Sequence, residues 1–402
     1  MEETSCVYGI NHKTRCMVSQ IAEQEKNRFI IGTQDPREDN EIHLLEYDED
    51  ENEISSIIFK HPGEVWSITS HPFMSDLLFT TYKIPNTTTM KTSLWKMNNT
   101  NVTDDSIEEH FIDNLFTFNS DYKIKKIICE PSESSTKLAT LEENTINIWD
   151  INNLSETSES IRSYTVPPNP YNEKIQFTSG VWSPHSGDVF VTANNEDILS
   201  WDCRKDGIAM KIENAHEMLV QDVDYNPNKP YFIATAGNDC NIKIWDIRLP
   251  NEPLKIMSDH SHWVWNVKFN HYHDQLLISS SSDCQVNLQS AVSVSSSAKF
   301  LEEKSLFVID EKSDLEEKNS MDDSINMNYS SYEQELFYTG AGTSHPVDGI
   351  ISTYDQHEDS VYSITWSNSD PWIFGSLSYD GRFVINIVPS EEKYKIFNIT
   401  CS

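Results

Sequence analysis

The chain of 402 residues contains little glycine and no long apolar run. It has 12 glycines, well below an average usage of about 7%, which disfavours sites built on glycine-rich phosphate-binding loops. Its seven cysteines are dispersed without any CxxC spacing, so the sequence predicts reduced thiols rather than a disulfide framework or a zinc site. No apolar run approaches the roughly 20 residues needed to cross a bilayer, and the first residues lack the apolar stretch of a secretory signal. We therefore expect a cytoplasmic protein without direct membrane insertion.

Basic residues are also scarce. There are 30 Lys and Arg against 64 Asp and Glu, a formal net charge of -34. A field of this sign repels phosphate backbones and anionic lipid headgroups, so we expect no nucleic-acid partner. Hydrophobic residues make up 37% of the chain and aromatic residues 11%. This is enough for a large core, and the chain as a whole is not disordered.

Three segments, which begin at His216, His260 and His357, repeat one pattern of short strands and turns. Each strand alternates apolar and polar residues, as half-buried strands do. A small sheet cannot cover both of its own faces, whereas copies arranged radially cover one another. Weaker copies fill the rest of the chain, with Arg28 to Gly32 and Glu41 to Tyr47 taken as the inner strands of the first. Third strands are expected to end near Tyr47, Lys96, Asp150, Asp202, Asp246, Ser290 and Ile387.

The repeats resemble the WD repeat, whose blades form β-propellers. This resemblance implies a hydrogen-bonded set of His, Ser or Thr, Asp and Trp in each complete blade. The only full set is His216, Thr235, Asp239 and Trp245. The partial sets are His260, Ser279 and Asp283, with Gln289 at the Trp position, and His357, Ser376 and Asp380, with Asn386 at that position. We therefore interpret residues 1–402 as one all-β domain, a seven-bladed WD-repeat β-propeller.

A His–Asp pair beside a hydroxyl group is also part of a hydrolase triad. Its recurrence in three repeats at fixed spacing favours a structural role. His262, His271 and His273 lack the spaced carboxylate or cysteine partners of a metal site, and no GxSxG, P-loop or HExxH motif occurs. The sequence predicts a protein that is not an enzyme, with no catalytic residues, metal or cofactor. An enzyme that uses the axial channel remains a hypothesis, and it requires titratable residues converging at the channel mouth.

Two segments do not fit the repeats. Residues 98–118 are rich in Asn, Thr and acidic residues and are expected to form a long surface loop. Residues 291–349 separate the sixth third strand from His357, and positions 299–345 hold 11 acidic residues and 4 lysines. We expect this Ser-rich segment to be a disordered insertion in the last blade. It is either a tolerated loop or a phosphorylatable tether.

The ends of the chain offer two ways to close the ring. A strand from Val7 to Ile10 or one from Tyr394 to Phe397 could complete the last blade. We favour the N-terminal segment, because an N-terminal strand commonly completes the last blade of WD proteins.

One rim of the propeller is the predicted partner-binding surface. On the WD template, the residues that flank the first inward Val of each inner strand, and the residue before the turn Asp, point to this rim. They are Glu64, Trp66, Leu219, Gln221, Trp263, Trp265, Ser360 and Tyr362, together with Asn238, Ser282 and Tyr379. Clustered exposed aromatic residues are typical of protein interfaces, although burial between blades is the alternative for any one of them.

Longer segments resemble the family of EARP and GARP complex-interacting WD-repeat proteins. They include residues 177–185 (FTSGVWSPH), 260–267 (HSHWVWNV) and 376–382 (SLSYDGR), and the resemblance covers almost the whole chain. It implies a non-catalytic adaptor that binds subunits of the EARP and GARP vesicle-tethering complexes. Its expected roles are recruitment of these complexes to membranes in endosomal recycling, endosome-to-Golgi retrograde transport and dense-core vesicle sorting.

The same resemblance implies a protein that is monomeric outside the complex and associates with the trans-Golgi network and endosomes only through its partners. Other WD proteins offer an alternative, namely a substrate receptor of a ubiquitin ligase or a chromatin-binding scaffold.

Removal of residues 300–340 is expected to leave the melting temperature of the protein nearly unchanged, because so acidic and Ser-rich a segment contributes little to a packed core. Differential scanning calorimetry of the deletion variant checks this. A drop of more than a few degrees would show that the segment packs on the blades.

Overall fold

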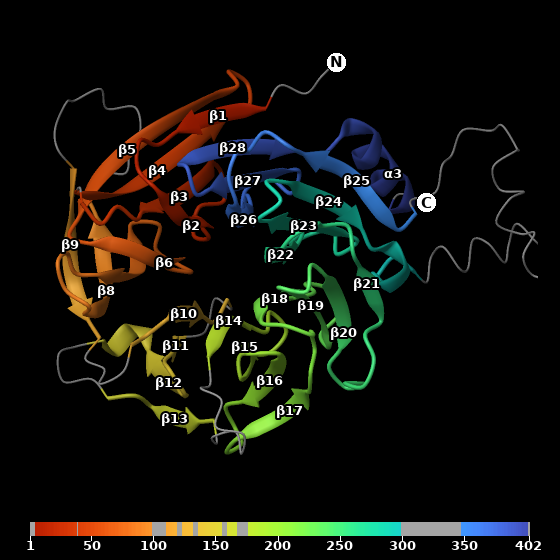
Figure 1. Ribbon diagram of the computed structural model, residues 1–402, viewed down its shortest axis with the longest axis horizontal. Coiled ribbons are helices and arrows are strands. Elements are labelled where there is room, and N and C mark those ends of the chain that lie inside the picture. Colours follow the sequence, from red (N-terminus) through yellow and green to blue (C-terminus); the bar gives the residue numbers. More distant parts are fainter. Residues whose placement is uncertain are drawn as a thin grey trace, which may run out of the picture.

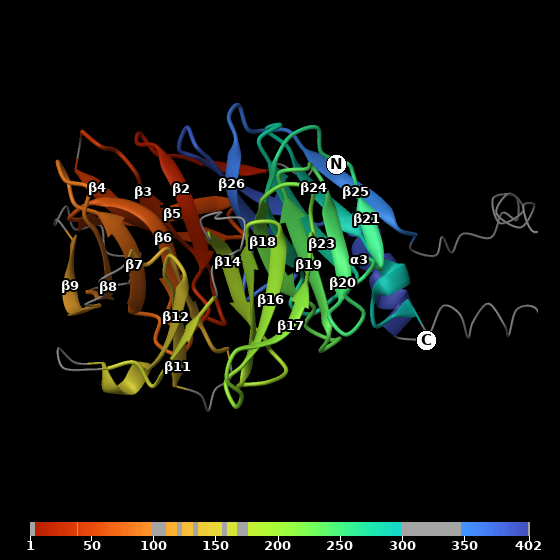
Figure 2. The same cartoon turned by 60° about the horizontal axis from the view of Figure 1, so that its bottom comes forward.

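Seven four-stranded antiparallel blades stand around a central axis in the computed structural model (Figure 1). The structure describes residues 5–37, 39–98, 110–118, 123–131, 136–154, 159–166, 176–298 and 347–400. The predicted all-β, seven-bladed propeller is therefore confirmed. In Figure 1 the innermost strand of each blade lies nearest the axis, and Figure 2 shows the same ring turned by 60°. No helix among the described residues is long and apolar enough to cross a membrane.

Blades 1 to 7 follow one another along the chain. Blade 1 contains β2 (Thr14–Ser19), β3 (Asn27–Thr33), β4 (Asn40–Asp48) and β5 (Glu53–His61). Blade 2 contains β6 (Glu64–Ser70), β7 (Leu77–Lys83), β8 (Met90–Met97) and β9 (His110–Thr117). Blade 3 contains β10 (Lys126–Cys129), β11 (Lys137–Leu141), β12 (Thr145–Asp150) and β13 (Arg162–Thr165). Blade 4 contains β14 (Phe177–Trp182), β15 (Val189–Asn194), β16 (Asp197–Asp202) and β17 (Ile208–Ile212).

The remaining blades carry the recognisable repeats. Blade 5 contains β18 (Val220–Tyr225), β19 (Phe232–Gly237), β20 (Ile242–Asp246) and β21 (Lys255–Met257). Blade 6 contains β22 (Val264–Phe269), β23 (Leu276–Ser281), β24 (Val286–Ser290) and β25 (Gly349–Tyr354). Blade 7 contains β26 (Val361–Trp366), β27 (Ile373–Ser378), β28 (Arg382–Ile387) and β1 (Cys6–Gly9). The predicted third strands correspond to β4, β8, β12, β16, β20, β24 and β28.

The core lies between the blades rather than within them. The described buried apolar residues form seven clusters, and each cluster draws its members from two neighbouring blades. Between blades 3 and 4, for example, Leu141 and Tyr164 pack with Phe190 and Trp201. Because apolar burial is the dominant stabilising contribution, each blade depends on both of its neighbours.

The N-terminal strand closes the ring, as predicted. β1 pairs antiparallel with β28 from Cys6 opposite Ile385 to Gly9 opposite Arg382. The alternative closing segment, Tyr394 to Phe397, instead belongs to helix α3 (Ser390–Thr400). Within α3, Ile396 is buried in the cluster between blades 6 and 7.

Two sequence-based expectations about strands are wrong. The inner strand of blade 1 is β2, and residues 28–32 and 41–47 belong to the second and third strands. Residues 110–117 are not part of a surface loop but form β9, which pairs with β8 and, in parallel over two residues, with β5 of blade 1. This parallel pairing joins blades 1 and 2 into one eight-stranded sheet.

The acidic insertion lies in blade 6, not in the last blade. β25 follows the insertion in sequence but pairs with β24, so it is the outer strand of blade 6. Each WD sequence repeat begins with the outer strand of the preceding blade, which explains the offset. Residues 299–346 lie outside the described residues, but the flanks do not. Val292 is buried, and Asp348 accepts hydrogen bonds from Ser293 and pairs with Lys255.

Gly381 fixes the contact between the closing strand and blade 7. Its φ is +89°, a Cβ would lie 2.2 Å from the carbonyl oxygen of Ile10, and its own carbonyl accepts a hydrogen bond from Ile10. We expect Gly381→Ala to lower the free energy of unfolding by roughly 3 kcal/mol or more, as backbone strain and a clash add up. Gly207 has φ of +91° with nothing within 4 Å of a Cβ. Gly207→Ala is therefore the matched control, with an expected loss of about 1 kcal/mol. Urea unfolding measures both, and equal losses would contradict the clash.

Candidate protein-interaction site

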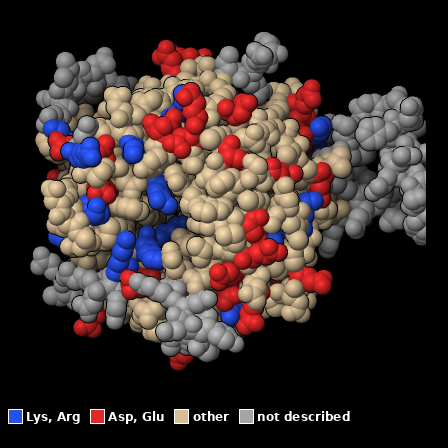
Figure 3. All heavy atoms as spheres, in the orientation of Figure 1, with Lys and Arg blue, Asp and Glu red and all other residues tan. Residues whose placement is uncertain are grey.

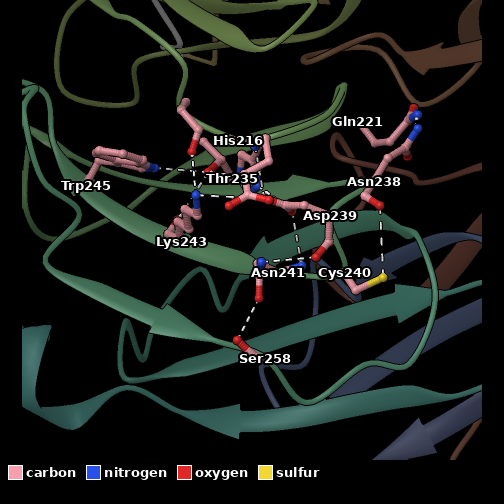
Figure 4. A network of polar contacts seen from close by, with 12 residues as sticks. His216, Gln221, Thr235, Asn238, Asp239, Cys240, Asn241, Lys243, Trp245 and Ser258 are labelled. Carbon is pink, nitrogen blue, oxygen red and sulfur yellow. Dashed lines mark hydrogen bonds and ion pairs between the residues drawn. The ribbon is translucent and has the colours of Figure 1, made fainter.

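The structure brings together the full set in blade 5 (Figure 4). His216 Nδ1 donates to Asp239 Oδ1 at 2.8 Å, and His216 Nε2 lies 2.7 Å from Thr235 Oγ1. Trp245 Nε1 donates to the same hydroxyl at 3.1 Å. A neutral imidazole that donates through Nδ1 must accept through Nε2, so the Thr235 hydroxyl donates to His216. Burial lowers the pKa of His216 although Asp239 opposes this. Burial would raise the pKa of Asp239, but hydrogen bonds from His216, Glu217 and Asn241 bring it to about 2.

Blade 6 keeps the histidine, the aspartate and the hydroxyl residue of this set but not the tryptophan. His260 Nδ1 lies 3.0 Å from Asp283 Oδ2, and its Nε2 lies 2.8 Å from Ser279 Oγ. Gln289 occupies the Trp position but donates to Asp259, so the Ser279 hydroxyl receives no donor from it.

Blade 7 is built differently from the expectation. His357 does not bond Asp380 directly; its Nδ1 lies 2.8 Å from Ser378 Oγ, which in turn donates to Asp380. Its Nε2 lies 2.7 Å from Ser376 Oγ, and Asn386 Nδ2 donates to the same oxygen at 2.9 Å. Asn386 therefore supplies the donor that Trp245 supplies in blade 5.

Blades 2, 3 and 4 contain related hydrogen-bonded sets that were not predicted from the sequence. In blade 2, His61 Nε2 lies 3.0 Å from Thr80 Oγ1, to which Trp95 donates at 2.7 Å. Blades 3 and 4 keep only the last pair, in which the indole of Trp149 or Trp201 donates to a buried threonine nine residues earlier, Thr140 or Thr192. This Thr–Trp spacing was the signal available in the sequence.

These sets are inaccessible to a substrate. The hydroxyl residues Thr235, Ser279 and Ser376 are 0% exposed, so none can act as a nucleophile on a molecule from solution. Burial raises the pKa of the Cys16 and Cys129 thiols to about 12. No group of three or more His, Cys, Asp or Glu suited to a metal ion occurs in the part of the chain that the structure describes.

The accessible feature is a ring of side chains at the mouth of the axial channel. Six inner strands skip one residue in their pairing with the next strand, and the skipped residues are Arg15, Trp66, Thr178, Gln221, Trp265 and Tyr362. In blade 3, Lys125 takes this place, since its backbone N–H bonds Leu141 and the next residue pairs with Leu141. A β-bulge re-aims the side chain that it carries. All seven line one hollow of about 380 Å³, and we call them the mouth ring.

Arg15 organises the aromatic side of the mouth ring. Its guanidinium carbon lies 4.7 Å from the ring centroid of Tyr362, 5.5 Å from that of Trp265 and 5.7 Å from that of Trp66. Trp265 and Tyr362 contact each other at 4.7 Å between centroids, and Trp265 Nε1 donates to Ser282 at 2.6 Å. Arg15 was missed from the sequence because β2 was not recognised as an inner strand.

The other predicted rim residues differ in accessibility. Trp263 is 40% exposed and contacts Trp265 edge-on at 6.0 Å, and Tyr379 contacts Tyr362 at 5.7 Å. Leu219 and Ser360 are half-buried. Gln221 donates to the buried Asn238. Glu64 has to be corrected: it is 5% exposed and its carboxylate pairs with Lys83 at 2.8 Å, so it is not presented to a partner.

Titratable residues do converge below the mouth ring, as the enzyme hypothesis required. Asp222, which is 1% exposed, pairs with Lys268 at 2.8 Å and accepts a hydrogen bond from Ser179. Lys126 donates to Ser179 and lies 3.9 Å from Asp222. Burial raises the pKa of Asp224 to about 6. These groups satisfy one another within the channel wall, which is what buried charges require whether or not chemistry occurs.

Fold and hydrogen-bond sets together define a WD-repeat β-propeller, and residues 349–385 match the model of the WD domain, G-beta repeat. Residues 2–289 match the model of the EIPR1 beta-propeller family. The chain belongs to this family.

Relatives match the chain over nearly its whole length. It is 37% identical to an EARP-interacting protein homolog of Danio rerio and 36% identical to EARP and GARP complex-interacting protein 1 of Homo sapiens, with 98% of the chain and 99% of each relative covered. It is 39% identical to an EARP-interacting protein homolog of Dictyostelium discoideum, with 96% and 95% covered. These names describe proteins that interact with complexes, as an adaptor does.

Acid is expected to destabilise the protein through its buried histidines. Burial lowers the pKa of His61 from 6.5 to about 4. Between these two pH values, His61 is therefore protonated in the unfolded chain but neutral in the folded protein. Stability is therefore present above pH 6.5 and lost as the pH falls towards 4, by about 2 kcal/mol at pH 5 from this residue.

Urea unfolding of the wild type and of His61→Gln at pH 7 and pH 5 checks this. The variant is expected to be less stable at pH 7 but to lose about 2 kcal/mol less on acidification. His262→Gln, at an exposed position, is the control and should keep the wild-type slope. An unchanged slope in His61→Gln would contradict the assignment.

Proposed function

We propose that this protein is an adaptor that binds subunits of the EARP and GARP vesicle-tethering complexes. The observation that carries the proposal is the similarity over 98% of the chain to proteins named for interacting with these complexes. Such coverage means that the relatives share the whole propeller with this chain and not a single motif.

The mouth ring and Trp263 form the docking surface in this proposal. Trp, Tyr and Arg are the residues most enriched among interface hot spots, and here they lie in one contact network. Trp263 and Trp66 are 40% and 38% exposed, so both offer apolar area to a partner while their neighbours hold them in place. Rigid aromatic anchors lose little conformational freedom on binding.

Through this binding, the adaptor supports recruitment of the complexes to endosomes and the trans-Golgi network, in endosomal recycling, retrograde transport and dense-core vesicle sorting. It acts as a monomer outside the complex and reaches membranes through its partners. Its net charge of -34 supports this indirect route, because anionic headgroups repel it.

Trp263→Ala is expected to weaken binding of the tethering complexes by about 30-fold, the cost of truncating a hot-spot residue. The measurement is affinity purification of the tagged full-length protein from cells, with tether subunits quantified by mass spectrometry. Tyr272→Ala is the matched control, because Tyr272 is 58% exposed but follows the end of β22, whereas Trp263 precedes its start.

Unchanged capture by Trp263→Ala in a folded protein would remove this residue from the docking surface. Absence of tether subunits from the wild-type purification, with components of a ubiquitin ligase or chromatin in their place, would overturn the proposed function.

A further inference from the structure

The mouth ring is cationic in a strongly acidic protein. Of its seven residues, Arg15 and Lys125 are basic and none is Asp or Glu. Lys123 adds a further cation, since it is exposed and its Nζ lies 5.6 Å from the ring centroid of Trp66. Figure 3 shows Lys and Arg side chains gathered beside the central hollow, over the region of β6 and β10, whereas Asp and Glu surround this region and are spread over the rest of the face out to its edge.

The charge of Arg15 is not balanced by a carboxylate. Its guanidinium contacts three aromatic faces, and no carboxylate of the described residues forms an ion pair with it. Cation–π contacts hold a guanidinium in place without occupying its five N–H donors. With 64 acidic residues in the chain, an arginine kept apart from all described carboxylates is a specific arrangement.

The carboxylates deeper in the channel do not neutralise the mouth either. Asp222 pairs with Lys268 at 2.8 Å and lies 3.9 Å from Lys126, while Asp224 lies 3.9 Å from Lys268. Two lysines thus balance two aspartates, so these carboxylates do not neutralise the charge of Arg15.

We propose that the mouth ring binds an acidic segment of a partner protein, whose carboxylates pair with Arg15 and Lys123. An apolar side chain of the same segment rests on Trp66, Trp265 and Tyr362. This inference rests on the proposed function and names the chemistry of the partner segment. Arg presents a planar fork that matches a carboxylate. The acidic periphery repels other parts of an acidic partner and so directs its charge to the hollow.

The shape of the site favours a polypeptide over other anions. A hollow of about 380 Å³ admits one extended segment. A bilayer or a nucleic-acid duplex would have to approach over a broad area and would meet the acidic periphery at the same time, which costs electrostatic energy.

The test uses the purified full chain and a labelled peptide of Glu residues with one Phe, and the same peptide with Gln in place of Glu. Fluorescence anisotropy at low and at physiological ionic strength measures the affinity. The variants are Arg15→Glu, Arg15→Gln, which removes the charge but keeps a polar side chain, and Lys205→Glu. Lys205 is exposed in the turn after β16, beyond the opposite ends of the inner strands, so this control matches Arg15→Glu in charge change. Circular dichroism melting verifies that each variant is folded.

The expected result is a preference for the Glu peptide that weakens with salt, a loss of affinity of tenfold or more in Arg15→Glu, a smaller loss in Arg15→Gln and none beyond twofold in Lys205→Glu. Equal affinity for both peptides, or equal affinity of Arg15→Glu and wild type, would overturn the inference. Binding of phosphatidylserine vesicles that Arg15→Glu abolishes would overturn it in favour of a lipid ligand.

Purification of the tethering complexes separates this inference from the proposed function. If the wild type and Arg15→Glu capture the complexes equally while Trp263→Ala does not, the acidic-segment inference falls and the adaptor function stands. If the wild type captures none, the adaptor function falls, whatever the peptide shows.

Discussion

The apolar contact between neighbouring sheets is the interaction on which the rest of the structure depends. No blade has a core of its own, because every buried cluster is shared by two blades. The interface that closes the circle is therefore as important as the other six. There, Phe29 of blade 1 packs on Phe383 of blade 7 with ring centroids 5.4 Å apart, and β1 covers the edge of β28. A circle without a free edge also avoids the unpaired strand that promotes aggregation.

The form of a blade depends less on its hydrogen-bonded set than on this packing. Blade 5 has all four members, whereas blades 3 and 4 keep only a tryptophan and a threonine, yet the four-stranded sheets are of the same form. In blades 2 to 5 an indole donates to a buried threonine hydroxyl, and in blade 7 Asn386 replaces the indole. In blade 6 the hydroxyl of Ser279 keeps His260 as its partner. A buried polar group without any partner is costly, so each of these hydroxyl groups retains at least one.

The sequence predicted those parts of the fold that have strong local signals. The Trp–Asp pairs mark third strands, and the rim aromatics follow from their place beside an inward Val. It could not reveal β2, since Thr14 to Ser19 lacks the His that opens the clear repeats, nor β9, whose many polar residues suit an exposed outer strand. The link from His357 through Ser378 to Asp380 depends on side-chain conformations, which spacing does not specify. Arg15 was not predicted because it lies in β2.

The bulges in the inner strands separate recognition from folding. In six inner strands the bulged residue has no partner across the ladder and belongs to none of the buried apolar clusters between blades, so its contacts are with the mouth of the channel rather than with the core. A propeller of this kind can therefore change its ligand by substituting up to seven positions while every strand keeps its register. Substitutions in the mouth ring would thus change the ligand-binding surface of the channel without changing the strand pairing of the blades, and propellers of the same fold can differ in the ligand that binds at the channel mouth.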